Sequence, residues 1–404
     1  MDLHGARPDD LRVAVTDDRF PSLWRTGLLS AGGLVLSALP IFLVGGLAVQ
    51  IRHDLGFTET QLGAAVTVAF LFGAVAGPIG GRVADRVGGR IAIACGAALA
   101  SLSLAGTALF ARSWEMLLGC LVLGGLSFAF LDPGLAVVID SHVDPRSQGL
   151  AFGVKEASIP TATLLAGLAV PVIALEHGWR WAFLLGVVPL AVVAVGLRRV
   201  DGQRRAAPPT TDASATSVSR RTLGIVATSA ACASTASSGI GVFLTESAVA
   251  MGMAEGAAGL LLAAGSVAGI VTRVTTGIRA DRDGGPQLHT IWVMMAVGAV
   301  SMALAAAGSL PLLVVGAVGA FAGGWGWTGL LFLTLVRANP SAPGAGAGLG
   351  LLGLAIGNGL GPLAFGVAAE QLSFTVAWAG AAVLAGAGAV LARFAAPDFE
   401  PVRI

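Results

Sequence analysis

Apolar stretches about twenty residues long recur along the whole chain, and short breaks rich in charged residues, Gly or Pro separate them. A helix needs about 20 apolar residues to cross the hydrocarbon core of a bilayer. Hydrophobic residues make up 55% of the 404 residues and charged residues only 12%, a balance that a soluble fold could not bury. We therefore predict an all-α membrane protein with twelve transmembrane helices in two pseudo-symmetric six-helix bundles. The predicted spans are residues 26–50, 60–80, 91–111, 115–139, 149–171, 180–198, 223–249, 256–277, 288–308, 311–337, 346–368 and 374–395.

A polar stretch between the sixth and seventh predicted spans divides the chain into two halves. It is rich in Arg, Pro, Ser and Thr, a composition typical of a flexible linker. The predicted organisation is a cytoplasmic N-terminal tail at 1–25, an N-terminal bundle at 26–198, a cytoplasmic linker at 199–222, a C-terminal bundle at 223–395 and a cytoplasmic C-terminal tail at 396–404.

The basic residues predict which side of the membrane each loop faces. If both termini lie in the cytoplasm, the outer loops hold only Arg52, Arg112 and Arg180, whereas the inner segments hold about 19 arginines. Loops that remain in the cytoplasm are enriched in Lys and Arg. We therefore expect a multi-pass protein of the cytoplasmic membrane, the inner membrane of a bacterial cell, with both termini inside.

The two halves of the sequence resemble each other when the chain is shifted by about 196 positions. The pattern Gly-x-x-Ala-Asp-Arg-x-Gly-Gly begins at Gly81 and again at Gly277, each time at the inner end of a predicted helix. Gly88 and Gly89 permit a tight turn, and Asp85 is an anion able to meet a helix N-terminus or an arginine. A plain turn that keeps positive charge inside is the alternative interpretation. Because each half has an even number of helices, the repeat predicts halves related by an axis along the membrane normal.

Residues Gly81–Arg90 resemble the signature loop between helices 2 and 3 of the major facilitator superfamily, and Gly277–Pro286 resemble a weaker copy between helices 8 and 9. The resemblance extends to helix count, linker and repeat, and so covers essentially the whole chain. It implies a secondary transporter in which the Asp and Arg of this loop latch the outward-open state. The second copy ends without the basic residues of the first, so we expect its latch to be weak or absent. The residues assigned to gating are Gly81, Asp85, Arg86, Gly88, Arg90, Gly277, Asp281 and Arg282.

Ionisable side chains within the predicted spans are costly in lipid and indicate a partner or a function. Asp132 in helix 4 and Lys155, the only lysine, in helix 5 lie at equal depth, each roughly 10 Å from the inner surface. Three interpretations stay open. Lys155 and Glu156 snorkel together to the cytoplasm, or Asp132 and Lys155 form a structural salt bridge, or they bind substrate or protons directly.

Two further charged residues lie near helix ends. Arg273 is about one turn from the inner end of helix 8, and we expect it to snorkel or to bond to the latch. Glu246 lies near the outer end of helix 7, where an extracellular gate or a solvated rim would explain it. Of these two, we expect Glu246 to lie at a solvated rim.

In the superfamily that the chain resembles, helices 1, 4, 7 and 10 line the central cavity. Unusual residues fall on three of these helices: an aspartate on helix 4, a run of hydroxyl side chains on helix 7 and two tryptophans far from the ends of helix 10. The predicted substrate-binding residues are Asp132, Lys155, Ser234, Ser238, Trp325 and Trp327.

The sequence favours transport over catalysis. It has no Walker A motif for ATP, and its spans contain no nucleophile–base pair and no cluster of metal ligands. A net charge of +1 favours no nucleic-acid partner. We expect a monomer in the lipid bilayer that has no catalytic residues and uses no cofactor or metal.

Two classes of substrate stay open. Lys155, together with the absence from helix 5 of the Gly-Pro-x-x-Gly-Gly signature of proton-coupled drug antiporters, favours a permease for a small organic anion or metabolite, with a proton as the coupling ion in symport. The alternative is an exporter of amphipathic drugs or metabolites that uses Trp325 and Trp327 as an apolar wall. A membrane sensor that does not transport is a third interpretation.

Overall fold

The computed structural model describes residues 23–143, 148–198, 218–283, 285, 287–338 and 343–399. Within these ranges every regular element is a helix, and twelve segments are long and apolar enough to cross a membrane. The prediction of an all-α protein with twelve membrane-spanning helices is therefore confirmed. The predicted linker at 199–222 falls largely outside the described residues, as do most of the two predicted tails.

The N-terminal half contains six of the spanning segments. Its helices are α2 (Leu23–Gly46), α3 (Ala48–Leu55), α4 (Glu59–Val87), α5 (Gly89–Phe110), α6 (Trp114–His142), α7 (Gln148–Ala169), the π-helical segment η2 (Val170–Ala174), α8 (Leu175–His177), α9 (Trp179–Leu185) and α10 (Pro189–Leu197).

The C-terminal half contains the other six. Its helices are α11 (Arg220–Ser238), α12 (Ile240–Ala250), α13 (Glu255–Asp283), α14 (Leu288–Ala305), α15 (Leu310–Gly319), the π-helical segment η3 (Ala320–Gly324), α16 (Thr328–Ala338), α17 (Pro343–Gln371), α18 (Phe374–Ala395) and the short 3-10 helix η4 (Ala396–Phe399).

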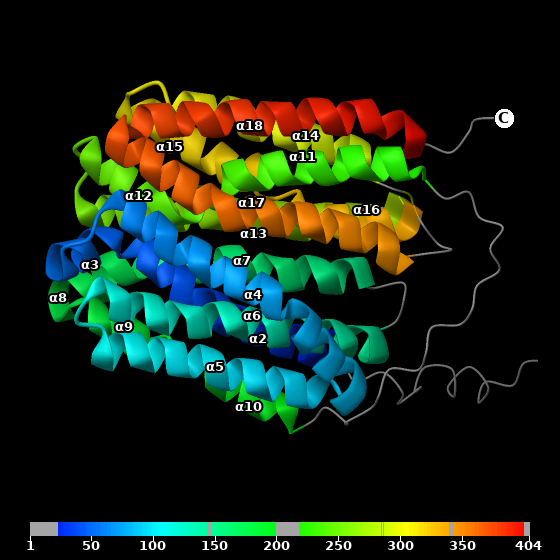
Figure 1. Cartoon of the computed structure of the whole chain (residues 1–404), viewed down its shortest axis with the longest axis horizontal. Coiled ribbons are helices and arrows are strands. Elements are labelled where there is room, and N and C mark those ends of the chain that lie inside the picture. The colour runs from blue at the N-terminus through cyan, green and yellow to red at the C-terminus, as the bar shows by residue number, and fades with distance from the viewer. Residues whose placement is uncertain are drawn as a thin grey trace, which may run out of the picture.

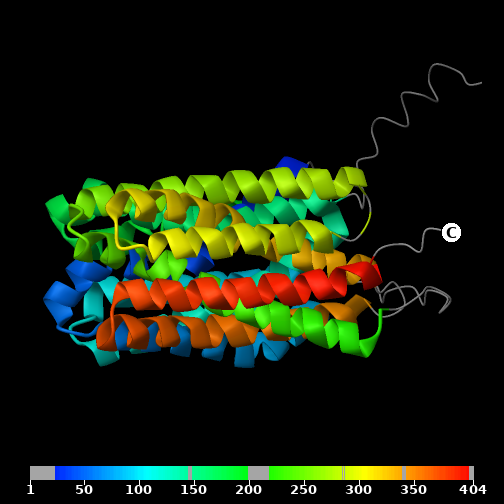
Figure 2. The ribbon, with the colours of Figure 1, turned by 90° about the horizontal axis from the view of Figure 1, so that it is seen from above.

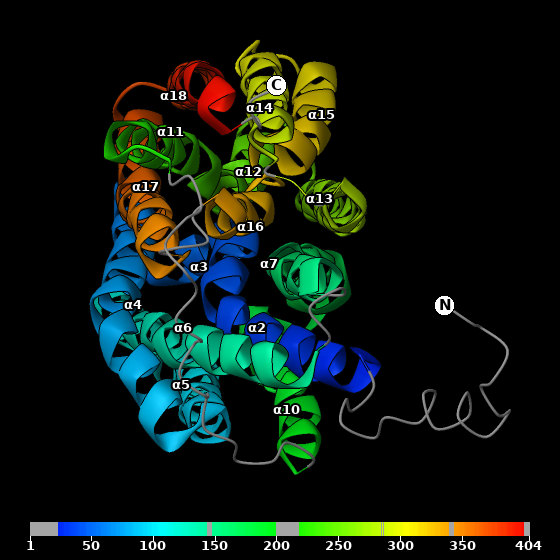
Figure 3. The ribbon, with the colours of Figure 1, turned by 90° about the vertical axis from the view of Figure 1, so that its right-hand side faces the viewer.

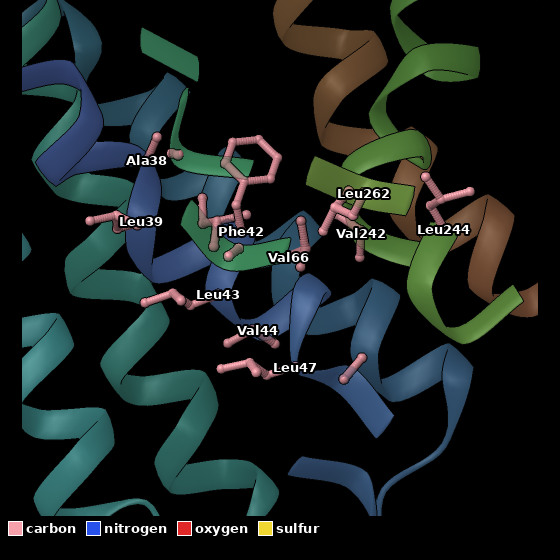
Figure 4. Packing of buried hydrophobic residues seen from close by; sticks show 14 of the residues in the cluster. Ala38, Leu39, Phe42, Leu43, Val44, Leu47, Val66, Val242, Leu244 and Leu262 are labelled. Atoms are coloured by element: carbon pink, nitrogen blue, oxygen red, sulfur yellow. The ribbon is translucent and has the colours of Figure 1, made fainter. Parts of the chain in front are cut away.

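The helices run along one long axis, so the bundle has two ends (Figures 1 and 2). We call the end at which α10 ends and α11 begins the linker end, and the opposite one the α3 end. The two halves meet along three pairs of helices, α7 with α13, α4 with α17, and α2 with α12 (Figure 3). The largest cluster of buried apolar side chains crosses this interface, and Figure 4 shows Phe42 of α2 in the same cluster as Val242 of α12 and Leu262 of α13.

Glycines allow the backbones of the two halves to approach closely. A Cβ atom on Gly63 of α4 would collide with the carbonyl oxygen of Pro362 of α17, and one on Gly167 of α7 would lie 2.5 Å from that of Gly259 of α13. Real side chains do not tolerate such overlaps, so these positions need glycine. Both contacts lie in the part of the bundle nearer the α3 end.

Helix boundaries repeat at the offset seen in the sequence. The helices α4 and α13 each contain 29 residues and begin at Glu59 and Glu255, which are 196 positions apart. The fourth and tenth spanning segments begin at Trp114 and Leu310, again 196 positions apart. The relation between the halves by an axis along the membrane normal stays a prediction.

The outer surface of the bundle is apolar. Large side chains such as Val75, Val383 and Phe394 are mostly exposed. A continuous surface of this kind is unfavourable in water and stable against lipid tails. The bundle is therefore suited to a bilayer on its outside, while its polar groups lie between helices or at its two ends.

The inner end of helix 2 differs from the sequence-based expectation. We predicted a loop after residue 80, but α4 continues to Val87 and carries Asp85 and Arg86 in its last turn. Of the two glycines that follow, only Gly88 has the positive φ angle of a tight turn, 103°. Gly89 already belongs to α5 and packs against α6, where a Cβ atom would lie 2.7 Å from the carbonyl oxygen of Gly134.

Helix 10, predicted as continuous, is broken. The segment η3 follows α15, residues 325–327 form a turn, and α16 begins only at Thr328. Gly323, Gly324 and Gly326 lower the cost of leaving the helical conformation. The two tryptophans that lie far from the helix ends therefore belong to a break in the helix.

Candidate functional site

A cluster of charged side chains lies inside the bundle on α6 and α7. The Nζ atom of Lys155 is 2.5 Å from Oδ1 of Asp132 and 3.2 Å from Oε1 of Glu156. The Lys155 side chain is only 6% exposed, whereas Asp132 is 49% and Glu156 21% exposed. The predicted pairing of Lys155 with Asp132 is confirmed, and snorkelling of Lys155 to the surface is wrong. Direct binding of substrate or protons by these residues stays a prediction.

The antiparallel course of α6 and α7 brings these residues together. Asp132 lies ten residues before the end of α6 at His142, and Lys155 lies seven residues after the start of α7 at Gln148, so both are at similar distances from the linker end. Pro133 follows Asp132 directly and interrupts the helical hydrogen-bond ladder there. Lys155 is the buried centre of the cluster, and Asp132 is its most accessible member.

Arg273 of α13 lies on the other side of the interface and is 2% exposed. Its Nη2 atom donates to the carbonyl oxygen of Trp325 at 2.7 Å and to Oγ1 of Thr328 at 3.4 Å. It therefore satisfies a backbone carbonyl that the break in helix 10 leaves without a helical partner. The expectation that Arg273 snorkels or bonds to the latch is wrong, because it points into the protein at the break.

A narrow pocket separates Arg273 from the charged cluster. It is lined by Phe152, Gly153, Glu156, Arg273, Thr276, Gly277, Gly326, Gly329, Leu330 and Leu333. Glu156 from the N-terminal half and Arg273 from the C-terminal half thus border the same space. The Nε and Nη1 atoms of Arg273 are buried and have no hydrogen-bond partner among the described residues.

The hydroxyl groups predicted on helix 7 lie at a helix–helix contact. Ser234 donates to the carbonyl oxygen of Leu354 at 3.1 Å and to Oδ1 of Asn358 at 2.8 Å, both on α17. Ser238 donates to the carbonyl oxygen of Thr235 at 3.0 Å. Both serines are buried away from the charged cluster, so their assignment to substrate binding stays a prediction that this geometry does not favour.

The two tryptophans of helix 10 have different surroundings. Trp325 packs its ring against Phe42 of the N-terminal half at 5.4 Å and against Phe321 at 5.6 Å. Trp327 is fully buried within the C-terminal half, and its Nε1 donates to the carbonyl oxygen of Gly324 at 2.8 Å. Only Trp325 lies close to the charged residues, with its ring centre 5.4 Å from Cζ of Arg273.

Polar contacts close the α3 end between the two halves. Arg52 of α3 is 2.5 Å from Oε1 of Glu246 on α12 and 2.6 Å from Oε1 of Glu59 on α4. Gln50 donates to Oε2 of Glu255 at 2.6 Å. Glu246 is 4% exposed, so its expected place on a solvated rim is wrong, and it instead forms part of a contact that joins the halves.

At the linker end the two copies of the repeated motif differ. Asp85 and Arg86 are exposed, and within the described ranges neither side chain forms a hydrogen bond or an ion pair. Asp281, in contrast, accepts a hydrogen bond from the backbone N–H of Leu150 at 2.8 Å, in the first turn of α7. It also lies 3.5 Å from Nη2 of Arg337. Asp281 therefore joins the two halves in this structure. The expectation that the second latch is weak or absent in gating stays a prediction.

The remaining residues assigned to gating lie around these two aspartates. A Cβ atom on Gly81 would meet no neighbour within 4 Å, and Arg90 and Arg282 are exposed. Gly277 is buried and faces α7, where it lies beside Gly153. Their roles in gating stay predictions. Within the described part of the chain, no group of three His, Cys, Asp or Glu side chains is placed to hold a metal ion.

The sequence alone did not indicate the pairing of Arg52 with Glu246 or the role of Arg273 at the helix break. A signal for the first was present, because both residues fall at the outer end of the first helix of their half. For the second, the run Gly-Gly-Trp-Gly-Trp at 323–327 was the available signal.

These features define a polytopic membrane protein whose described residues include twelve spanning helices and whose two halves meet around buried charges. A sequence model described as Major Facilitator Superfamily matches residues 30–227, from α2 to the beginning of α11. Together with the twelve spanning helices, this match shows that the chain belongs to the major facilitator superfamily, and it is a membrane transporter. A search among curated proteins finds no match to the chain.

Proposed function

We propose that this transporter is a secondary active permease of the cytoplasmic membrane that moves a small organic anion together with a proton by alternating access. The observation that carries the proposal is the ion pair between the buried Lys155 and the half-exposed Asp132, 2.5 Å apart inside the bundle. A charge at this depth needs a partner, and such pairs often mark the path of a substrate or a proton.

The balance of charge supports coupling to a proton. Asp132, Lys155, Glu156 and Arg273 comprise two carboxylates and two cations, so the set is neutral when all four are ionised. An added anion leaves one net negative charge in a poorly hydrated place, which is unfavourable. A proton taken up by Asp132, the accessible carboxylate, restores neutrality and releases Lys155. We therefore expect one proton for each monovalent anion.

The contacts between the halves support alternating access. At the α3 end, the halves are joined by Arg52 with Glu246 and by the backbone N–H of Thr60, which donates to Glu370 at 2.9 Å. At the linker end, Asp281 joins α13 to α7, but Asp85 on α4 is exposed. This pattern fits a state that is closed at the α3 end and less restrained at the linker end.

The arginines support an orientation with the linker end in the cytoplasm. Arg52, Arg112 and Arg180 lie at the α3 end, whereas the other described arginines outside the bundle interior, such as Arg82 and Arg279, lie toward the linker end. Cytoplasmic loops carry the excess of positive charge. In this orientation, a state that is closed at the α3 end faces inward.

The alternative of an amphipathic exporter relies on Trp325 and Trp327 as an apolar wall. Both side chains are packed inside the protein here. Burial therefore favours the organic anion as the substrate over a large apolar compound.

Transport in proteoliposomes tests the proposal. The full chain is reconstituted with a pH-sensitive dye inside, and monocarboxylates are added outside at constant membrane potential. We expect an anion-dependent change of internal pH with the wild type, its loss in Asp132→Asn, and its retention in Glu176→Gln, which changes an exposed carboxylate at the α3 end. Anion uptake without proton movement would contradict the coupling, and movement of amphipathic cations alone would support the exporter.

A further inference from the structure

Among the buried and half-buried lysine and arginine side chains of the described residues, Arg273 alone has no ion pair. Lys155 has two carboxylates within ion-pair distance, Arg52 has two, and Arg180 and Arg337 have one each. Arg273 has none among the described residues, although it is the most buried arginine of the described chain. The counter-charge that faces it is Glu156 across the pocket, beyond ion-pair distance, so this buried guanidinium loses hydration without gaining a close ion pair.

Most of the hydrogen-bonding capacity of Arg273 is unused. A guanidinium offers five N–H donors, but only Nη2 finds acceptors, at Trp325 and Thr328. The Nε and Nη1 atoms have none among the described residues. A structural role at the break in helix 10 accounts for Nη2 and leaves Nε and Nη1 without partners among the described residues.

The pocket beside Arg273 has the features of a site for a small anionic group. Phe152 and Gly153 of α7 line one side of it, and Gly326 of the helix break and Gly329 of α16 line the other. Its polar members are Glu156, Thr276 and Arg273. The Cγ atom of Glu156 would lie 3.3 Å from a Cβ on Gly329, so this carboxylate lies directly against the C-terminal half.

We propose that this pocket binds the carboxylate group of a small organic anion, with Arg273 as its charged partner and Glu156 as the group that competes with it. The inference rests on the proposed function and names the substrate class and the group that holds it. Lys155 is already paired with two carboxylates, so it is the weaker attractor of an anion in this state. Arg273 also suits a carboxylate geometrically, since a guanidinium can donate two parallel hydrogen bonds to it.

The position of the pocket explains how an anion would act on the whole molecule. Arg273 belongs to the C-terminal half and Glu156 to the N-terminal half, and α7 and α13 pack along each other. An anion bound to Arg273 repels Glu156 and offsets the positive charge that attracts Glu156 across the pocket. Glu156 is then held more strongly by Lys155. Occupancy of the pocket therefore changes a contact between the halves, which is the kind of differential interaction that shifts a conformational equilibrium.

Binding to the purified full chain tests the inference without a transport assay. Melting temperature and tryptophan emission are measured against sodium acetate and sodium benzoate, with acetamide and benzamide as neutral counterparts and sodium chloride at matched ionic strength. A ligand that binds the folded state raises the melting temperature in proportion to its occupancy. We expect saturable shifts with the carboxylates and none with the amides.

Three variants assign the response to this pocket. In Arg273→Met, the affinity for acetate and benzoate should fall roughly ten- to hundredfold. In Arg279→Met, which removes an exposed arginine from the same helix, it should not change. In Glu156→Gln, loss of the competing charge should tighten the affinity severalfold, and this gain keeps the inference testable even if Arg273→Met does not fold.

Several results would overturn the inference. Equal affinity in wild type and Arg273→Met, equal responses to carboxylates and amides, or unchanged or weaker affinity in Glu156→Gln each contradict it. If the wild type carries carboxylates into proteoliposomes and Arg273→Met does so equally well, the proposed function stands and the site is wrong. If the wild type moves no carboxylate, the proposed function fails, and so does the inference that rests on it.

Discussion

Glu246 of α12 and Arg52 of α3 lie 2.5 Å apart and join two helices that belong to different halves of the chain. The glutamate is almost fully buried, whereas the arginine is 27% exposed and holds Glu59 as a second partner. The pair is therefore asymmetric, because only Glu246 depends entirely on it. Its Oε2 atom has no hydrogen-bond partner within the described residues, which increases that dependence.

Removal of Arg52 should destabilise the protein more than removal of the charge of Glu246. Arg52→Met leaves Glu246 buried without a counter-charge and should cost about 3–5 kcal/mol. Glu246→Gln keeps the shape of the side chain and leaves Arg52 paired with Glu59, so its cost should be about 1–3 kcal/mol. Melting in detergent measures both, with Glu176→Gln as the exposed control at the same end. Equal losses in the two variants would argue against the asymmetry.

The pair of Lys155 and Asp132 should be coupled in stability. Lys155→Met and Asp132→Leu should each lower the unfolding free energy, and the double variant should recover part of the loss. The loss in Asp132→Leu should be the smaller one, because Lys155 keeps Glu156 at 3.2 Å. Denaturation of the four proteins gives the coupling energy, which should exceed about 0.5 kcal/mol for residues in contact. Additive losses would show that the pair contributes nothing jointly.

The two copies of the repeated motif should respond differently to loss of charge. Asp281→Asn removes a charge-assisted hydrogen bond to the start of α7, so it should lower stability by about 1–3 kcal/mol. Asp85→Asn changes an exposed side chain, so its effect on stability should stay within about 0.5 kcal/mol. If Asp85 latches the opposite state, the same substitution should still slow transport. Paired melting and uptake measurements separate the two effects, and a normal uptake rate in Asp85→Asn would exclude a gating role.

The α3 end should also contribute a pH-dependent stability. The hydrogen bond from Arg180 to Asp54, at 2.6 Å, lowers the pKa of the Asp54 carboxyl below its ordinary value of 3.8, and a second bond from Trp179 adds to this effect. A depressed pKa in the folded state means that the contribution is present above pH 3.8 and is lost as the pH falls through the folded-state pKa. The difference in melting temperature between wild type and Asp54→Asn should therefore shrink below about pH 4. A difference that stays constant down to about pH 2 would contradict this assignment.

The orientation of the protein in the membrane can be tested with reporter fusions. A reporter fused after residue 404, and one inserted in the linker at 199–222, should both report the cytoplasm, because the excess of arginine lies at that end. One placed after Arg112, between α5 and α6, should report the outside. A signal from the outside at the linker position would reverse the orientation.

Much of the fold could be predicted because bilayer thickness fixes how long an apolar helix must be. The twelve predicted spans correspond to the twelve spanning segments, and they differ mainly at ends such as Val87, where a helix continues beyond the apolar run. The break at 325–327 could not be predicted in this way. Its residues are apolar, so hydropathy does not distinguish a turn there from a continued helix.

The charged cluster was partly predictable for a similar reason. Antiparallel neighbours place Asp132 and Lys155 at equal depth, so counting residues made their pairing one of the three predicted interpretations. The pairing of Arg52 with Glu246 and the place of Arg273 depend on which face each helix turns toward the other half. Packing between helices far apart in the chain determines which face this is, and the local sequence does not.

The close glycine contacts between the halves have a mechanical consequence. At Gly63 with Pro362, and at Gly167 with Gly259, backbone meets backbone with no side chain between. Toward the linker end, a Cβ atom on Gly153 would be 3.3 Å from the nearest atom of α13, the carbonyl oxygen of Arg273. Because these backbone contacts are among the closest approaches described between the halves, we expect them to act as a fulcrum when one half rocks on the other. Because this fulcrum lies toward one end of a long bundle, we expect a few degrees of rocking there to give a much wider movement at the other end.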